Sequence, residues 1–208
     1  MNDDTEHFRW ITLLKNGLED WFAEDAEHLG AVQLYDWFES KEHVLVSAKL
    51  RWYPVEGRPD LCHAPDVMVV LAHPSGERES YKQWEEHGRP PNVVFEFIGP
   101  SKPAADFLTE LDFYSSRGCD EFYVFDYRNG RFQAFHRDGT PMLAPVPPGP
   151  DGSWHSPLLG MDFGVNDSRH LWIRRPDGKL METQKEISAR AKRYAAKLRE
   201  LGVDPDSV

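Results

Sequence analysis

The sequence predicts an α/β protein in which a mixed β-sheet is flanked by helices and followed by a C-terminal helical tail. Two apolar runs of strand length, residues 66–72 and 93–98, indicate strands that are covered on both faces. A helix-like segment then separates the second run from a further apolar strand at residues 121–126. This strand–helix–strand order favours a right-handed crossover with parallel or mixed pairing.

The length of 208 residues suits one domain and a tail. We expect a domain at residues 1–178, with its core at about 43–137, and a C-terminal helix and tail at 179–208. No apolar run reaches the length of about 18 residues that a membrane span needs. The N-terminus also lacks the basic and apolar regions of a secretory signal. We therefore expect a cytoplasmic protein that has no membrane partner.

The formal net charge of −11 is distributed unevenly. Residues 1–42 contain eleven acidic and three basic side chains, whereas residues 179–208 contain five acidic and seven basic ones. An acidic chain is a poor match for nucleic-acid phosphates. A nucleic-acid surface would therefore have to be a local basic patch, helped by divalent cations that neutralise carboxylates.

The N-terminal third is predicted to contain a helix and a β-hairpin. Apolar residues at helical spacing predict a helix over 8–22. Residues 31–42 are compatible with a second short helix or with an irregular segment. Residues 43–53 are rich in β-branched and aromatic side chains, which predicts a strand that pairs with 66–72 as a hairpin.

The middle of the chain begins with a polar, irregular segment at residues 73–91. A helix is predicted over 103–116, with Ser101 as its N-cap and Gly118 just beyond its end. The dipeptide Asn129-Gly130 between two apolar segments predicts a tight hairpin.

The C-terminal third is predicted to contain a loop, a hairpin and a helix. The proline-rich residues 141–157 indicate an irregular surface loop, and residues 170–180 indicate a hairpin around Asp177-Gly178. Residues 181–201 have an apolar seam at helical spacing that extends over about two heptads. This helix would either pack on its own domain or pair with a second chain in a homodimer.

Two carboxylates stand beside the apolar strands. Glu96 interrupts the strand at 93–98, and Asp66 opens the run at 66–72. If both project toward one spot, their hard oxygen donors favour a divalent cation, typically Mg²⁺. Such an ion activates water and stabilises charge on an attacked phosphate, which predicts phosphodiester hydrolysis. The structural alternative is that Asp66 caps a turn and that Glu96 pairs with an internal Arg.

Other catalytic patterns are weaker. Asp106 and Glu110 are four residues apart on the predicted helix, a spacing that is more typical of a solvated helix face than of a site. The motifs GxSxG, HExxH and GxxxxGK[ST] do not occur. The nine histidines are scattered, and none is singled out as a ligand or base.

Four pieces of sequence, in order and at characteristic spacing, resemble the Uma2 family of the PD-(D/E)XK nuclease superfamily. They are Pro65-Asp66, SYKQWEE at 80–86, VVFEFIGPS at 93–101 and DFYSSRGCDEFYVFD at 112–126. The resemblance implies a restriction-endonuclease-like fold and cleavage of DNA. It also implies that Asp66 and Glu96 are the ligands of Mg²⁺ or Mn²⁺.

The chain departs from this family at the lysine. Ile98 occupies the superfamily's usual lysine position, and Uma2 proteins commonly place the lysine on the next helix, four residues before the tyrosine that corresponds to Tyr114. Here that position is Glu110, which reverses the charge. We consider Lys102 and Lys82 as substitutes, and Asp106, which matches an acidic residue of the family's helix, as a third metal ligand.

Three functions are therefore compatible with the sequence. The first is a metal-dependent DNA endonuclease that uses Asp66, Glu96 and either Lys102 or Lys82. The second is a catalytically degenerate nuclease-fold protein that acts as a binding or scaffold module. The third is an unrelated adaptor that self-associates through residues 181–201.

Overall fold

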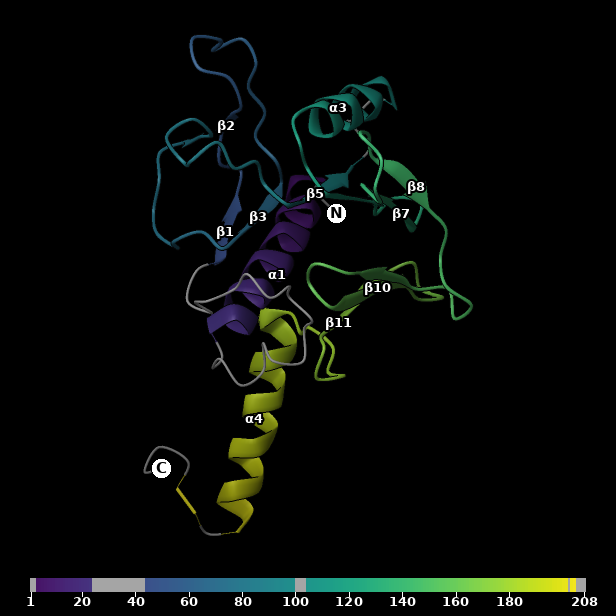
Figure 1. Ribbon diagram of the computed structural model, residues 1–208. Helices are drawn as coiled ribbons and strands as arrows, with labels where there is room; N and C mark the ends of the chain where they lie inside the picture. Colours follow the sequence, from purple (N-terminus) through teal and green to yellow (C-terminus); the bar gives the residue numbers. More distant parts are fainter. Residues whose placement is uncertain (1–2, 24–43, 100–103, 202, 205–208) are drawn as a thin grey trace.

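The computed structural model describes residues 3–23, 44–99, 104–201 and 203–204 (Figure 1). These residues form three helices, a central mixed sheet and two smaller sheets. The predictions for residues 31–42, Ser101 and Lys102 fall outside the described residues. None of the three helices combines the length and apolar composition that a membrane span requires.

The central sheet has six strands in the order β1-β3-β5-β6-β7-β8. Strands β5 and β6 are parallel, and the other neighbouring pairs are antiparallel. The sheet is therefore mixed, as predicted. Its strands are β1 (Val44–Ala48), β3 (Val67–Leu71), β5 (Val93–Ile98), β6 (Glu121–Asp126), β7 (Arg131–His136) and β8 (Ala144–Val146).

The crossover between the two parallel strands confirms the strand–helix–strand prediction. Helix α3 (Ala104–Ser116) connects β5 to β6. Gly118 follows the helix with a φ of 97°, a conformation that glycine adopts more readily than other residues. The turn brings β6 back beside β5 with Glu96 next to Val124.

Apolar side chains cover both faces of this sheet, and they alternate along each strand. One cluster includes Val67, Phe95 and Phe97 and packs against helix α1 (Asp3–Ala23). The other includes Met68 and Val94 and packs against α3. Helices α1 and α3 lie on opposite sides of the sheet (Figure 1). Helices on both faces of a mixed sheet agree with the predicted restriction-endonuclease-like architecture.

The strand predicted over 43–53 is interrupted. It divides into β1 and the short β2 (Trp52–Tyr53), because Lys49 adopts a left-handed backbone conformation with a φ of 53°. Strand β1 still pairs with β3 in antiparallel register, so the predicted hairpin pairing is confirmed.

The polar segment at 73–91 packs against the domain. It contains β4 (Tyr81–Lys82), which pairs in parallel with β2. The Tyr81 side chain is fully buried and donates a hydrogen bond of 2.8 Å to the Arg89 carbonyl. One buried aromatic residue therefore anchors a segment whose composition predicted only irregular structure.

The loop predicted over 141–157 is partly wrong. Residues of this segment form β8 and β9 (Trp154–Ser156). Pro145 is accommodated because β8 is an edge strand, where the missing N–H leaves no internal hydrogen bond unmade. Strand β9 joins a second sheet with β10 (Met161–Val165) and β11 (Leu171–Arg174). The predicted hairpin around Asp177-Gly178 is confirmed, since Arg174 and Leu180 form an antiparallel bridge and the Arg175 N–H donates a hydrogen bond of 2.8 Å to the Lys179 carbonyl. A further hairpin, between β10 and β11, lies upstream of it.

The predicted C-terminal helix is present as α4 (Gln184–Glu200). It begins with a capping box, in which Thr183 accepts a hydrogen bond from the Glu186 backbone N–H and the Glu186 side chain accepts from the Thr183 backbone. The helix extends away from the sheet (Figure 1). Tyr194 and Leu201, two members of the predicted apolar seam, are exposed.

Candidate active site

Asp66 lies directly before β3 with its side chain fully buried. Its Oδ2 accepts a hydrogen bond of 2.7 Å from the Phe97 backbone N–H of β5. Its Oδ1 accepts one of 2.9 Å from His7 Nε2 of α1 and forms an ion pair with Lys49. The carboxylate thus joins two neighbouring strands to a helix from the N-terminus.

These partners keep Asp66 ionised. Burial by itself would raise the pKa of the carboxyl group, but the hydrogen bond from His7 and the charge of Lys49 outweigh it and lower the pKa below its usual value. A carboxylate that remains charged at neutral pH retains its ability to bind a cation.

No sequence pattern singles out Lys49 or His7. Lys49 stands in a strand-like run, and His7 is 59 residues from its partner in the chain. The left-handed turn at Lys49 brings its ammonium to Asp66, while 54% of the lysine side chain stays exposed. The Lys49 ammonium therefore reaches the buried Asp66 carboxylate from the solvent side.

Glu96 is buried in the middle of β5. Its Oε1 accepts a hydrogen bond of 2.6 Å from the Tyr114 hydroxyl of α3. Burial, followed by the charge of Glu96, raises the pKa of Tyr114 well above its usual value, so the phenol remains a donor. The phenol fixes the position of one carboxylate oxygen.

Two further side chains surround Glu96. Glu110 of α3 is buried, whereas Asp106, one turn earlier, is exposed. The prediction of a solvated helix face is therefore wrong for Glu110. His63 Nε2 lies 3.4 Å from Glu110 Oε1. One ligand atom each from His63, Glu96 and Glu110 lies within 4.8 Å of the other two.

Asp66 and Glu96 take their side-chain partners from opposite sides of the sheet. His7, which binds Asp66, contacts Phe97 in the cluster that packs on α1, whereas Tyr114, which binds Glu96, belongs to the α3 cluster. Asp66 is not a member of the group of His63, Glu96 and Glu110. The Phe97 N–H, one residue after Glu96, connects the two environments.

The other predicted site residues have different surroundings. Lys82 lies in β4 and forms an ion pair of 3.0 Å with Glu85. Asp106 is an exposed residue in the first turn of α3. Lys102 lies outside the described residues.

The donor atoms near Glu96 suit a divalent cation. Carboxylate oxygens from Glu96 and Glu110 are the ligands that Mg²⁺ and Mn²⁺ accept. Asp66 offers further carboxylate oxygens, although Lys49 shares its Oδ1. Glu96 and Glu110 therefore fit a divalent cation, whereas Asp66, whose two oxygens meet His7, Lys49 and the Phe97 N–H, does not join them.

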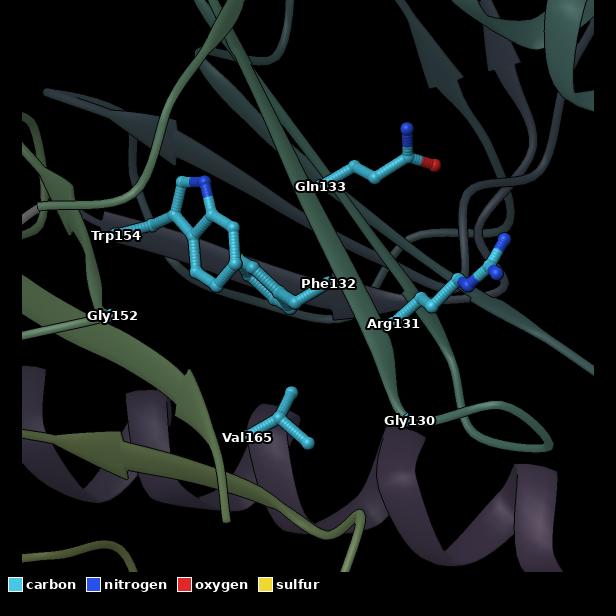
Figure 2. Close-up of a pocket in the computed structure, with 7 residues that line it drawn as sticks. All are labelled: Gly130, Arg131, Phe132, Gln133, Gly152, Trp154 and Val165. Carbon is cyan, nitrogen blue, oxygen red and sulfur yellow. The ribbon is translucent and has the colours of Figure 1, made fainter. Parts of the chain in front are cut away.

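Two cavities occur elsewhere. One, of about 400 Å³, lies beside β7 and is lined by Gly130, Arg131, Phe132, Gln133, Gly152, Trp154 and Val165 (Figure 2). The Phe132 and Trp154 rings lie side by side there, with centroids 5.3 Å apart. The other, of about 800 Å³, is lined by parts of α1, β1 and residues 75–78. Neither cavity is lined by Asp66 or Glu96.

The model of the Uma2 family, described as "Putative restriction endonuclease", matches residues 12–166. No match was found among curated proteins. Among solved structures, the chain is similar to a protein from Anabaena variabilis described as "a putative nuclease belonging to DUF820", with 9% identity and a TM-score of 0.35. The match covers 58% of this chain and 62% of that one.

The match to the family model includes both carboxylates and the helix that follows them. It begins within α1 and continues to the end of β10, which is more than half of the chain. The chain therefore belongs to the Uma2 family.

Proposed function

We propose that this protein is a divalent-metal-dependent endonuclease that hydrolyses phosphodiester bonds in DNA. Its membership of a family described as "Putative restriction endonuclease" is the observation that carries the proposal. The positions of Asp66 and Glu96 support it. Val67 lies opposite Phe95 in the antiparallel pair, so Asp66 and Glu96 occupy the next position outward on neighbouring strands.

Glu96, with Glu110 beside it, would hold the ion, and Asp66 would hold Lys49. When bound, a divalent ion lowers the pKa of its water and offsets negative charge on the phosphate. The Tyr114 hydroxyl orients Glu96, and the Phe97 N–H and His7 orient Asp66. These contacts fix the carboxylates before the substrate arrives, as electrostatic catalysis requires.

Related nucleases have a lysine at the position of Ile98 or of Glu110. Lys49 is our candidate for the residue that replaces it. Its ammonium pairs with Asp66, and its side chain is half exposed, so it can also contact a substrate phosphate. A lysine at this place would stabilise the charge that develops during hydrolysis.

Helix α4 provides the local basic patch that DNA binding needs in an acidic protein. Its exposed basic side chains lie along the helix and include both of the last-turn cations. Phosphate contacts of this kind contribute affinity that does not depend on sequence. The exposed basic side chains of α4 are Lys185, Arg190, Lys192, Arg193, Lys197 and Arg199.

A DNA-cleavage assay tests the proposal. Wild type should cleave single- or double-stranded DNA in Mg²⁺ or Mn²⁺, and Asp66→Ala should reduce the rate at least 100-fold. Asp66→Asn, which preserves the shape of the side chain, should lose activity while remaining folded. Asp162→Ala removes a carboxylate on β10 that pairs with His155 of β9, and it is the matched control. Failure of the wild type to cut either DNA in either metal would contradict the proposal.

The alternative is a nuclease fold that binds without cleaving. The buried Glu110, at the position where the family commonly has a lysine, favours this alternative. Glu110→Lys discriminates between the two. If cleavage appears only in this variant, the natural chain is a binding module. If the wild type already cuts, the alternative is excluded.

We also propose that residues 179–208 are a separable tail through which two chains can pair. The exposed Tyr194 and Leu201 on α4 support this. The molar mass in solution should fall from that of a dimer to that of a monomer when the chain is cut after Glu182, which removes α4 but keeps Met181 packed on the core. An unchanged number of chains per particle would contradict the pairing.

A further inference from the structure

We propose that Arg131 and Arg169, which lie where two hairpin turns meet, bind phosphates of the DNA backbone beside the candidate active site. Arg131 follows the β6–β7 turn, and Arg169 lies in the β10–β11 turn. The inference rests on the proposed function and adds to it, because it says where the substrate backbone lies. Helix α4 extends away from the sheet (Figure 1), so phosphates near the attacked bond need contacts from another part of the chain.

The strand register places Arg131 at the end of the sheet where Glu96 lies. Glu96 is two residues before the end of β5, where Ile98 is opposite Asp126 of β6. Asp126 is in turn opposite Arg131, the first residue of β7. Neighbouring strands are about 4.8 Å apart, so the backbone of Arg131 lies about 10 Å across the sheet from that of Ile98. Arg131 therefore begins two strands away from the candidate site.

The Arg131 side chain projects to the same side of the sheet as Glu96. The next residue, Phe132, belongs to the cluster that packs against α1, and so do both residues that flank Glu96. Because side chains alternate along a strand, Arg131 and Glu96 both project to the α3 side. Figure 2 shows the side chains of Arg131 and Phe132 on opposite sides of β7. The guanidinium is therefore on the side of the sheet from which a phosphate would approach Glu96.

The β10–β11 turn adds a second arginine to this corner of the molecule. Arg169 has a left-handed backbone conformation with a φ of 62°. A Cβ atom added at Gly130 would lie 2.5 Å from the Cβ of Arg169, so the two turns are in direct contact. Two backbone N–H groups of the turn donate hydrogen bonds of 3.0 Å to the Asn166 side chain, which fix its shape. Arg169 is thus held beside the start of β7.

Both guanidinium groups are available to a ligand. Arg131 and Arg169 are exposed, and among the residues that the structure describes neither forms an ion pair. Arg128, in contrast, pairs at 3.2 Å with Asp126, which balances the charge of that carboxylate locally. Asp167 is the other aspartate of the two turns. A free guanidinium binds a phosphate through two parallel hydrogen bonds, so this corner suits a phosphate backbone.

The distance across the sheet suits a nucleic-acid strand. One strand of B-form DNA rises about 3.4 Å per nucleotide, so the step of about 10 Å from β5 to β7 spans about three nucleotides. A strand with its attacked phosphate at Glu96 would therefore present another phosphate at β7. Contacts to phosphates fix the position of a strand without reading its bases. Arg131 and Arg169 are thus positioning residues.

DNA binding by the full-length protein tests the proposal. Fluorescence anisotropy with labelled single- and double-stranded DNA of about 20 nucleotides, in Ca²⁺ and over a range of salt concentrations, gives the affinity and its salt dependence. Arg131→Gln and Arg169→Gln should each raise the dissociation constant at least about fivefold, and each should reduce the slope of log K against log salt by about 0.7–0.9. Arg131→Lys keeps the charge and should retain the slope.

Arg89→Gln is the matched control. Arg89 is exposed and donates to the Ala72 carbonyl just after β3, so it lies at the opposite end of the sheet. Its substitution removes the same charge and should change neither the affinity beyond about twofold nor the salt slope. Wild-type affinity and slope in both Arg131→Gln and Arg169→Gln would overturn the proposal. Loss of affinity in Arg193→Gln of α4 alone would overturn it as well.

A measurement on the wild type removes the dependence on variants that fold poorly. Phenylglyoxal modifies exposed arginines, and mass spectrometry locates them. Bound DNA should slow the modification of Arg131 and Arg169 at least threefold and leave that of Arg89 unchanged. Equal modification of Arg131 and Arg169 with and without bound DNA would contradict the phosphate contacts.

These results can be separated from the test of nuclease function. Binding by the wild type that depends on Arg131 and Arg169, without cleavage in Mg²⁺ or Mn²⁺, would overturn the nuclease proposal alone. Cleavage by the wild type, with unchanged affinity and salt slope in both variants, would overturn the phosphate contacts alone.

Discussion

The two sides of the central sheet give buried carboxylates different hydrogen-bond and charge partners. On the α1 side, Asp66 is held by Lys49, His7 and a backbone N–H, so a cation is already present. On the α3 side, Glu96 Oε1 accepts a hydrogen bond from a neutral phenol, and a second carboxylate, Glu110, lies nearby. The described contacts of the two carboxylates therefore differ: Asp66 pairs with a cation, whereas Glu96 accepts from a phenol and lies near a second carboxylate.

The difference originates in the strands themselves. Glu96 lies between Phe95 and Phe97, which face the α1 cluster, so strand alternation turns it toward α3. Asp66 precedes its strand and is not bound by that alternation. Its side chain instead accepts from the Phe97 N–H at the end of the ladder and reaches Lys49 and His7.

The largest expected effect is that of removing the α1-side carboxylate. Asp66→Ala leaves a buried N–H without its acceptor and separates Lys49 and His7 from their partner, so it should lower the free energy of unfolding by about 3–5 kcal/mol. Glu96→Ala should cost less, about 1–3 kcal/mol, because it also removes a negative charge beside Glu110. Urea denaturation measures both. An equal or larger loss in Glu96→Ala would contradict the contrast between the two sides.

The pH dependence of stability should also follow Asp66. Because its pKa in the folded state lies below the ordinary value of 3.8, the carboxylate stabilises the fold above that pH and loses this contribution as the pH falls toward the folded pKa. Within that window the free energy of unfolding should fall by up to about 1.4 kcal/mol per pH unit from this group. Asp66→Asn should show a shallower decline below pH 3.8 in denaturation curves. Parallel curves would argue against a lowered pKa.

A smaller effect is expected on the α3 side from Tyr114→Phe. The substitution leaves Glu96 Oε1 without its phenol donor, which should cost about 1–2 kcal/mol. Tyr194→Phe, on the exposed face of α4, is the matched control and should change stability by less than about 0.5 kcal/mol. Thermal and urea denaturation measure the difference. Equal effects at the two tyrosines would show that the buried hydrogen bond contributes little.

The smallest change in stability is expected for Lys49→Met. Because the lysine side chain is half exposed, its ion pair should contribute less than about 1 kcal/mol. The pKa of Asp66 should nevertheless rise, since one of the charges that lower it is lost. Carboxyl NMR titration detects this rise. Lys15→Met, which breaks an exposed pair with Glu19 on α1, should leave the Asp66 titration unchanged.

Local patterns were sufficient to predict the β5–α3–β6 unit and the hairpin at Asn129-Gly130, because continuous apolar runs and turn residues define them. They were insufficient at β8, where pairing with the edge of the sheet overrides a proline-rich composition. The break at Lys49 likewise depends on a backbone conformation that no neighbouring glycine signals.

The site was predictable only in part. Asp66 and Glu96 could be selected because a carboxylate beside an apolar strand is costly and requires a partner. Their partners could not, since His7, Lys49 and His63 reach the site from segments that are distant in sequence and share no motif. The burial of Glu110 also required the fold, because helical spacing alone grouped it with the exposed Asp106.

The left-handed backbone conformation at Lys49 is strained for a residue with a Cβ atom, but it places the lysine ammonium beside Asp66. A glycine there would relieve about 1 kcal/mol of steric conflict between Cβ and the following carbonyl. It would also delete the ammonium that meets Asp66. Selection for thermal stability alone should therefore enrich glycine at this position. If lysine persists in the selected variants, its charge is needed.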